Sequence, residues 1–153
     1  MWHNVITQED INDLLKQTDW FHDSCIKEMA YLSGAYVTDA LDMYPVNDLR
    51  ELRVLILRQK EDFPAIELVF QDVLFFYVSP NNPDYTSEIL EARIFIKNDR
   101  IFWTNADSPV VLNEDENGGV LICAKKLLWR IVDHRGDGRY YQSLNNQNPK
   151  TEL

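Results

Sequence analysis

The chain has few of the residues that build covalent or metal-held frameworks. It contains 2 cysteines, 3 histidines and 5 glycines in 153 residues. Cys25 and Cys123 lie far apart without a CxxC pair, which excludes zinc-ribbon and thioredoxin-like sites and indicates a reducing compartment or at most one disulfide. His3, His22 and His134 stand alone, with no HxH or HxxxH spacing. We therefore expect no metal site and no cofactor.

Long apolar segments and basic clusters are also missing. The apolar runs are far shorter than the roughly 20 residues of a membrane-spanning helix, and the N-terminal residues do not form a signal peptide. Acidic residues number 25 against 15 basic ones, a formal net charge of −10. Such a surface repels nucleic acids and anionic lipids, so we expect neither as a partner. We expect a cytoplasmic protein whose charge suits a basic protein partner, and the oligomeric state stays open.

What is present predicts a single α+β domain over residues 1–132, followed by a polar, mobile tail over 133–153. Thr7 and the acidic residues after it mark the start of an amphipathic helix over 8–17. The remainder is rich in β-prone residues, with connections too short for parallel crossovers. We therefore predict a predominantly antiparallel, curled sheet of about six to eight strands beside an N-terminal helix.

The predicted strands follow the β-prone runs. These runs are 49–57, 65–70, 73–78, 89–97, 101–105 and 120–132. Residues 25–32 fit neither the strand nor the helix period cleanly, so both stay open there, and we favour a hairpin over 25–37. The pair 71–72 marks either a hairpin turn or a bulge. The last run is a strand that either continues to its end or turns into a helix. Strict alternation in 89–97 places four apolar residues on the core face, namely Leu90, Ala92, Ile94 and Ile96, before a tight turn at 98–100.

The segment WFHDSC (20–25) gathers an imidazole, a carboxylate, a hydroxyl and a thiol. In a helix, His22 and Cys25 would share a face and suit a thiolate–imidazolium pair, with Asp23 as a further catalytic candidate. In a strand, consecutive side chains point apart, which leaves no complete catalytic set. We favour a structural interpretation, in which Trp20 and Phe21 anchor in the core and the polar residues turn the chain.

The aromatic residues of the predicted strands could line a cleft. We expect Phe75, Phe76, Tyr77, Phe102 and Trp103 to alternate between core and surface instead.

The order of a helix, FHDS (21–24), ELVFQDV (67–73) and AKKLLW (124–129) resembles small uncharacterised bacterial proteins, some of them grouped with toxin-immunity proteins. The resemblance implies a non-enzymatic, acidic protein-binding domain, an immunity-type inhibitor of a basic bacterial toxin. The alternative is a small enzyme or ligand-binding module with a cleft near His22 and Cys25. Two acidic clusters are the candidate partner-binding residues: Asp39, Asp42, Asp48, Glu114, Asp115 and Glu116.

Overall fold

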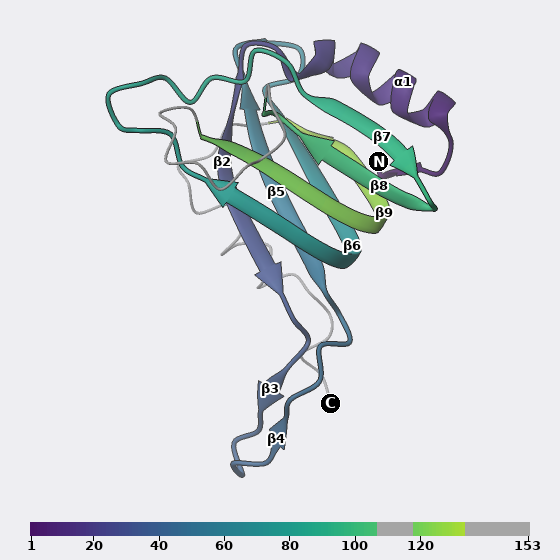
Figure 1. Cartoon of the computed structure of the whole chain (residues 1–153), viewed down its shortest axis with the longest axis vertical. Helices are drawn as coiled ribbons and strands as arrows, with labels where there is room; N and C mark the ends of the chain where they lie inside the picture. Colours follow the sequence, from purple (N-terminus) through teal and green to yellow (C-terminus); the bar gives the residue numbers. More distant parts are fainter. Residues whose placement is uncertain (107–117, 134–153) are drawn as a thin grey trace.

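The computed structural model describes residues 1–106 and 118–133 (Figure 1). The described chain begins with strand β1 (His3–Val5), helix α1 (Gln8–Thr18) and the short 3₁₀ turn η1 (Asp19–Phe21). The strands that follow are β2 (Ser24–Leu32), β3 (Tyr36–Val37), β4 (Met43–Tyr44), β5 (Glu51–Arg58), β6 (Ala65–Ser79), β7 (Arg93–Lys97), β8 (Arg100–Thr104) and β9 (Gly119–Val132). The predicted α+β class, with one N-terminal helix and mostly β structure, is confirmed.

Seven strands form one antiparallel sheet in the order β2-β5-β6-β9-β8-β7, and β1 pairs with β9. The centre is the long pairing of β6 with β9, which runs from the Ala65–Val132 pair to the Ser79–Gly119 pair. The pairing leaves β2 and β7 as edges, so the sheet is open. The predicted curl is not supported by this pairing.

The core lies between one face of the sheet and α1. Val54, Leu68 and Trp129 sit side by side on that face, one on each of three neighbouring strands. Ile11 and Leu14 of α1 are fully buried with them in one hydrophobic cluster. The helix therefore covers the sheet with a narrow apolar stripe, as its sequence pattern predicts.

The opposite face of the sheet buries an ion pair between β6 and β9. Glu67 of β6 is 0% exposed, and its Oε2 atom accepts a hydrogen bond from Nε of Arg130 at 2.7 Å. A guanidinium nitrogen of Arg130 lies 2.6 Å from the same oxygen, and the ring of Trp2 lies 4.5 Å from the guanidinium carbon. The ion pair with Arg130 offsets the free-energy cost of burying the Glu67 carboxylate.

Local sequence signals place the helix and the last hairpin correctly. The Thr7 side chain accepts a hydrogen bond from the Asp10 backbone, and the Asp10 carboxylate accepts one from Thr7 in return, a capping box. Asn98 and Asp99 connect β7 to β8 with φ of 51° and 57°, as a tight two-residue turn requires.

Residues 65–70 and 73–78 belong to a single strand, so the bulge is the correct alternative and the hairpin is wrong. Asp72 has φ of 52° and the pairing with β9 shifts between Val73 and Phe75. The Asp72 carboxylate is held by Arg50 at 3.1 Å and Lys126 at 3.5 Å. The run 120–132 is likewise one strand throughout.

The predicted core face of 89–97 is only half correct. Ala92 and Ile94 are buried, whereas Leu90 is 62% exposed and Ile96 is also exposed. The strand begins at Arg93, because the preceding backbone is bent by bonds from Ile89 N to Ser24 O (2.7 Å) and from Ala92 N to Trp20 O (2.8 Å). Ile89 is buried in place of Leu90, and Ile96 lies next to the exposed hairpin turn.

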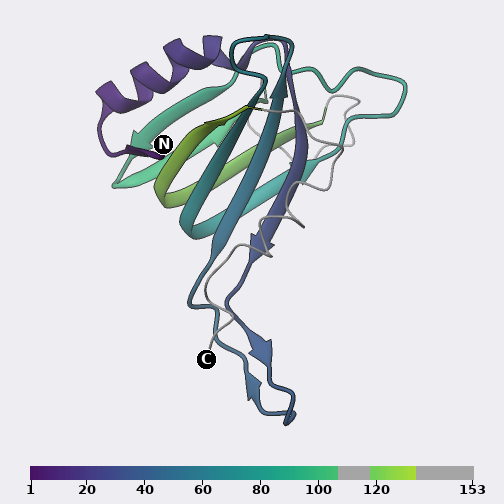
Figure 2. The same ribbon diagram turned by 180° about the vertical axis from the view of Figure 1, so that it is seen from behind.

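The predicted hairpin over 25–37 is also wrong. β2 pairs along its length with β5, and the chain between them continues outward as a narrow two-stranded extension containing β3 and β4. We call residues 35–49 the arm. It projects from the sheet, well away from α1, in both views (Figures 1 and 2).

Candidate functional site

The WFHDSC segment is a chain reversal between η1 and β2. Trp20, Phe21 and Asp23 all have positive φ, of 52°, 61° and 55°. Phe21 is fully buried as predicted, but Trp20 is 46% exposed, so its predicted core role is wrong. The left-handed backbone turns consecutive aromatic rings in different directions. The Ser24 hydroxyl donates a hydrogen bond to the Phe21 carbonyl, which supports the structural interpretation of this segment.

His22 and Asp23 contact each other, although an extended chain would separate them. Nδ1 of His22 lies 2.9 Å from Oδ1 of Asp23, and both side chains are about half exposed. The contact forms because Asp23 is left-handed and not extended. His22 does not line the cleft beside Cys25, so the proposed His22–Cys25 pair does not face a common cavity.

The cleft beside Cys25 has a volume of about 450 Å³. Asp23, Ser24 and Cys25 lie along it with Arg58, which is 3% exposed and donates to the Thr18 carbonyl at 3.1 Å. Burial lowers the pKa of Arg58, and the nearby Asp62 and Asp19 carboxylates oppose that shift. This guanidinium anchors the helix end to the sheet. The lining of the cleft includes the carboxylates of Asp23 and Glu88 but no histidine that could pair with the thiol.

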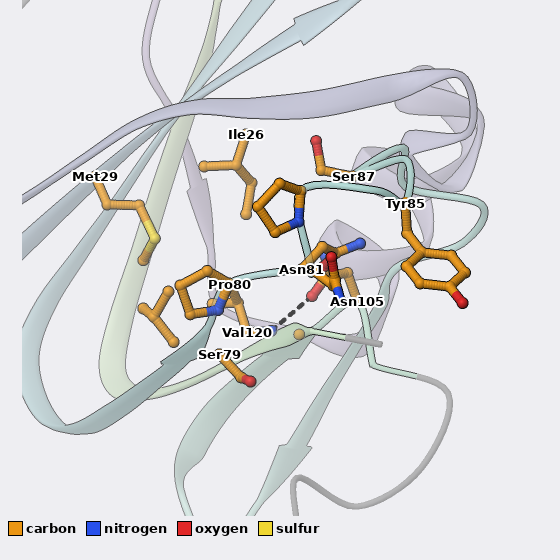
Figure 3. Close-up of a pocket in the computed structure, with 13 residues that line it drawn as sticks. Ile26, Met29, Ser79, Pro80, Asn81, Tyr85, Ser87, Asn105 and Val120 are labelled. Atoms are coloured by element: carbon orange, nitrogen blue, oxygen red, sulfur yellow. Dashed lines mark hydrogen bonds between the residues drawn. The ribbon is translucent and has the colours of Figure 1, made fainter. Parts of the chain in front are cut away.

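A second cleft of about 450 Å³ lies where β2, the end of β6 and the start of β9 meet the loop after β6 (Figure 3). Its lining combines apolar side chains, among them Ile26, Met29 and Val120, with the amides of Asn81 and Asn105. Both side-chain amides make hydrogen bonds within the protein. Asn105 Oδ1 accepts one from Val120 N at 2.8 Å, and Asn81 Nδ2 donates one to the Thr86 carbonyl at 2.7 Å. The lining is neutral and contains no acid–base pair.

The arm gathers one of the predicted acidic clusters. Thr38 N bonds to the Asp42 carbonyl at 2.9 Å, which closes a turn that places Asp39 and Asp42 at the tip. Asp48 lies nearer the sheet and accepts a hydrogen bond from the Tyr44 hydroxyl at 3.3 Å. The Asp48 charge raises the pKa of Tyr44. Glu114, Asp115 and Glu116 lie outside the described residues, so their binding role stays a prediction.

The arm also exposes apolar side chains, which the sequence interpretation missed. Every residue from 35 to 49 is exposed. The rings of Tyr36 and Tyr44 stack at 5.1 Å, Val37 and Met43 pair beside them, and Leu41 at the tip is 83% exposed. A signal was present: the pairs YV and MY flank the turn TDALD, without the longer alternation of a strand that packs on a core.

Within residues 1–106 and 118–133 no group of three or more His, Cys, Asp or Glu side chains is placed to hold a metal ion. No helix in the described part of the chain is long and apolar enough to cross a membrane. Searches against protein-family models, curated proteins and solved structures find no match to this chain. The geometry of the molecule is therefore what bears on its function.

Proposed function

We propose that the protein is a non-enzymatic, acidic protein-binding domain that acts in the bacterial cytoplasm as an immunity-type inhibitor of a basic toxin. The arm is its main contact element. The observation that carries the proposal is a projecting hairpin whose residues are all exposed, and which combines apolar side chains with Asp39, Asp42 and Asp48.

An exposed apolar extension of this kind has a physical cost for a monomer. A two-stranded hairpin alone is marginally stable in water, and contiguous exposed apolar side chains are typical of interaction surfaces. Tyr36, Tyr44 and Met43 give the arm large contact areas, and aromatic residues are enriched at the energetic centres of interfaces. The arm is therefore suited to insertion into a groove of a partner.

The charge of the arm defines the partner's chemistry. The arm carries three aspartates and no lysine or arginine, in a chain of net charge −10. Complementary charge accelerates encounter and penalises acidic competitors. A basic protein with an apolar groove fits both properties.

The test is co-purification of a basic partner with the full chain at low and high salt. We expect capture at low salt, loss at high salt, and loss at low salt for an Asp39→Asn/Asp42→Asn variant. The matched control, Asp13→Asn/Asp84→Asn, removes two exposed charges elsewhere and should retain capture. Equal capture by both variants would contradict the role of the arm.

A second candidate function rests on the cleft that Cys25 borders. A small enzyme or ligand-binding module would use this cleft, with Cys25 as nucleophile and Asp23 beside it. Alkylation by iodoacetamide at neutral pH tests the enzyme. A rate for Cys25 no faster than that of a free thiol would exclude an activated nucleophile.

A further inference from the structure

The outer face of the sheet, opposite the core, carries a row of aromatic rings. Phe75 of β6, Phe102 of β8 and Phe95 of β7 lie in register on this face, with Cys123 of β9 between the first two. The centroids of Phe75 and Phe102 are 6.4 Å apart, those of Phe102 and Phe95 are 4.9 Å apart, and Tyr77 lies 5.7 Å from Phe75. We call Phe75, Tyr77, Phe95 and Phe102 the aromatic face. Three of its rings are exposed, and Phe102 is half-buried between them.

The rim of this face is basic in an otherwise acidic protein. Lys97 and Arg100 lie opposite each other in the strand register at the end of the β7–β8 hairpin. The Arg100 charge acts to lower the pKa of the Cys123 thiol beneath the rings, against the effect of burial. Lys125 follows on β9, and all three basic side chains are exposed. None of the three makes an ion pair within the part of the chain that the structure describes. The neighbouring acids are Asp99 in the turn and Asp72 on β6, and Asp72 is already paired with Arg50 and Lys126, so the cations outnumber the acids here.

This combination selects an acidic and apolar occupant. The rings of Phe95 and Phe102 are parallel to within 7° and face each other, and Phe75 meets Phe102 edge-on. The stacked faces of Phe95 and Phe102 are thus occupied within the protein, and the net charge of −10 disfavours a nucleic acid as the occupant. Ring edges and flanking cations suit a protein segment with its own apolar and carboxylate groups.

The arm of the same chain has that chemistry. It presents Tyr36, Met43 and Leu41 with the carboxylates of Asp39 and Asp42, and it contains no basic residue. It also projects beyond the sheet that carries it, so it is available to another molecule (Figures 1 and 2). The two surfaces are complementary in both polarity and charge.

We infer that the arm of one copy docks on the aromatic face of a second copy of this chain. The contact is heterologous, because one molecule contributes its arm and the other contributes its aromatic face. It uses the arm that the proposed function assigns to a toxin, so self-association and partner binding compete. Self-association needs no foreign protein, and purified chain alone tests it.

The experiment is sedimentation of the full chain over a range of concentrations and salt. Two variants are each changed only at exposed positions: Asp39→Lys/Asp42→Lys in the arm, and Lys97→Glu/Arg100→Glu on the rim. Circular dichroism establishes that both are folded. We expect the unaltered chain to associate at low salt, and each variant to associate more weakly by roughly tenfold or more.

The mixture of the two variants is the decisive measurement. The rim variant keeps an unaltered arm and the arm variant keeps an unaltered rim, so their equimolar mixture should form a dimer at concentrations at which each variant alone stays monomeric. The control Asp13→Asn/Asp84→Asn should associate like the unaltered chain. A chain that stays monomeric at every concentration would overturn the inference, as would association that mixing does not restore. Neither result would affect capture of a toxin.

Discussion

At the scale of single residues, burial decides what an ion pair contributes. Glu67 is fully buried and held by Arg130 at 2.6–2.7 Å. In Glu67→Gln the shape is kept but the negative charge that pairs with the Arg130 guanidinium is removed, while Glu67 Oε1 already has no hydrogen-bond partner among the described residues. We expect the free energy of unfolding to fall by about 2 kcal/mol, measured by urea titration.

Asp19→Asn is the matched control for that change. Asp19 forms an ion pair with Lys60 at 2.8 Å, but its side chain is half exposed. Asparagine tolerates the left-handed backbone of this position as well as aspartate does. We expect the midpoint of the urea transition to stay close to that of the unaltered chain, since exposed pairs contribute little. A drop equal to that of Glu67→Gln would show that burial is not the deciding property.

The two cysteines should differ in reactivity. Cys123 is fully buried under the aromatic face, and burial raises the pKa of its thiol against the opposing Arg100 charge. A raised pKa leaves less thiolate at neutral pH, and thiolate is the reactive form. We expect iodoacetamide to label Cys25 before Cys123 in the folded protein, as measured by peptide mass spectrometry. In urea the two rates should converge; a difference that persisted there would refute this explanation.

At the scale of elements, the start of α1 depends on one carboxylate. The backbone N–H groups of Ile6 and Thr7 donate to Asp10 at 2.9 and 2.8 Å, and these bonds lower the pKa of Asp10. A lowered folded pKa contributes stability above the unfolded pKa, and that stability is lost as the pH falls through the folded value. We expect Asp10→Ala to be less stable than the unaltered chain at pH 7, with a difference that shrinks below about pH 4.

Asp13→Ala on the same helix is the control for this cap. Asp13 is exposed and lies beyond the first turn, so its removal takes away charge without removing a capping bond. Thermal unfolding of both variants across pH separates the two effects. A pH-independent loss for Asp10→Ala would contradict the role of its charge.

These elements also show which features of the fold can be predicted from sequence. The Thr7–Asp10 cap and the Asn98–Asp99 turn are local, and their residue types alone decide the conformation. Trp20 is different, because its exposure follows from a left-handed backbone that local propensity does not predict. The alternation predicted for 89–97 fails at its start for a similar reason, because the backbone N–H groups of Ile89 and Ala92 bond to residues distant in sequence.

The arm should be dispensable for folding. All its residues are exposed, and its stacked Tyr36 and Tyr44 contact each other and not the core. Replacing residues 35–48 with Asn-Gly shortens the connection between β2 and β5 to a tight turn. We expect the free energy of unfolding to change by no more than about 1 kcal/mol, measured by chemical denaturation. Loss of a cooperative transition would show that the arm belongs to the folding unit.

At the scale of the whole molecule, the candidate site was only partly predictable. The acidic residues of the arm are visible in the sequence, and so is the excess charge that favours a basic partner. Their grouping on a projecting hairpin is not, because it depends on β2 pairing with β5 across the intervening segment. The aromatic face similarly arises from Phe75, Phe95 and Phe102, which meet only through the pairings of four strands.

The same topology predicts how stability is distributed. β6 and β9 lie at the centre of the sheet, paired on both sides, whereas β2 and β7 are edges and the arm is joined to the sheet only at its base. Local opening requires least free energy where few buried contacts are broken. In hydrogen-exchange mass spectrometry we expect the arm to exchange first, the β2 and β7 edges next, and β6 and β9 only with global unfolding. Arm amides as protected as those of β6 would contradict this order for a monomer. If that protection appears only at high protein concentration, it instead follows from the arm docking on a second copy.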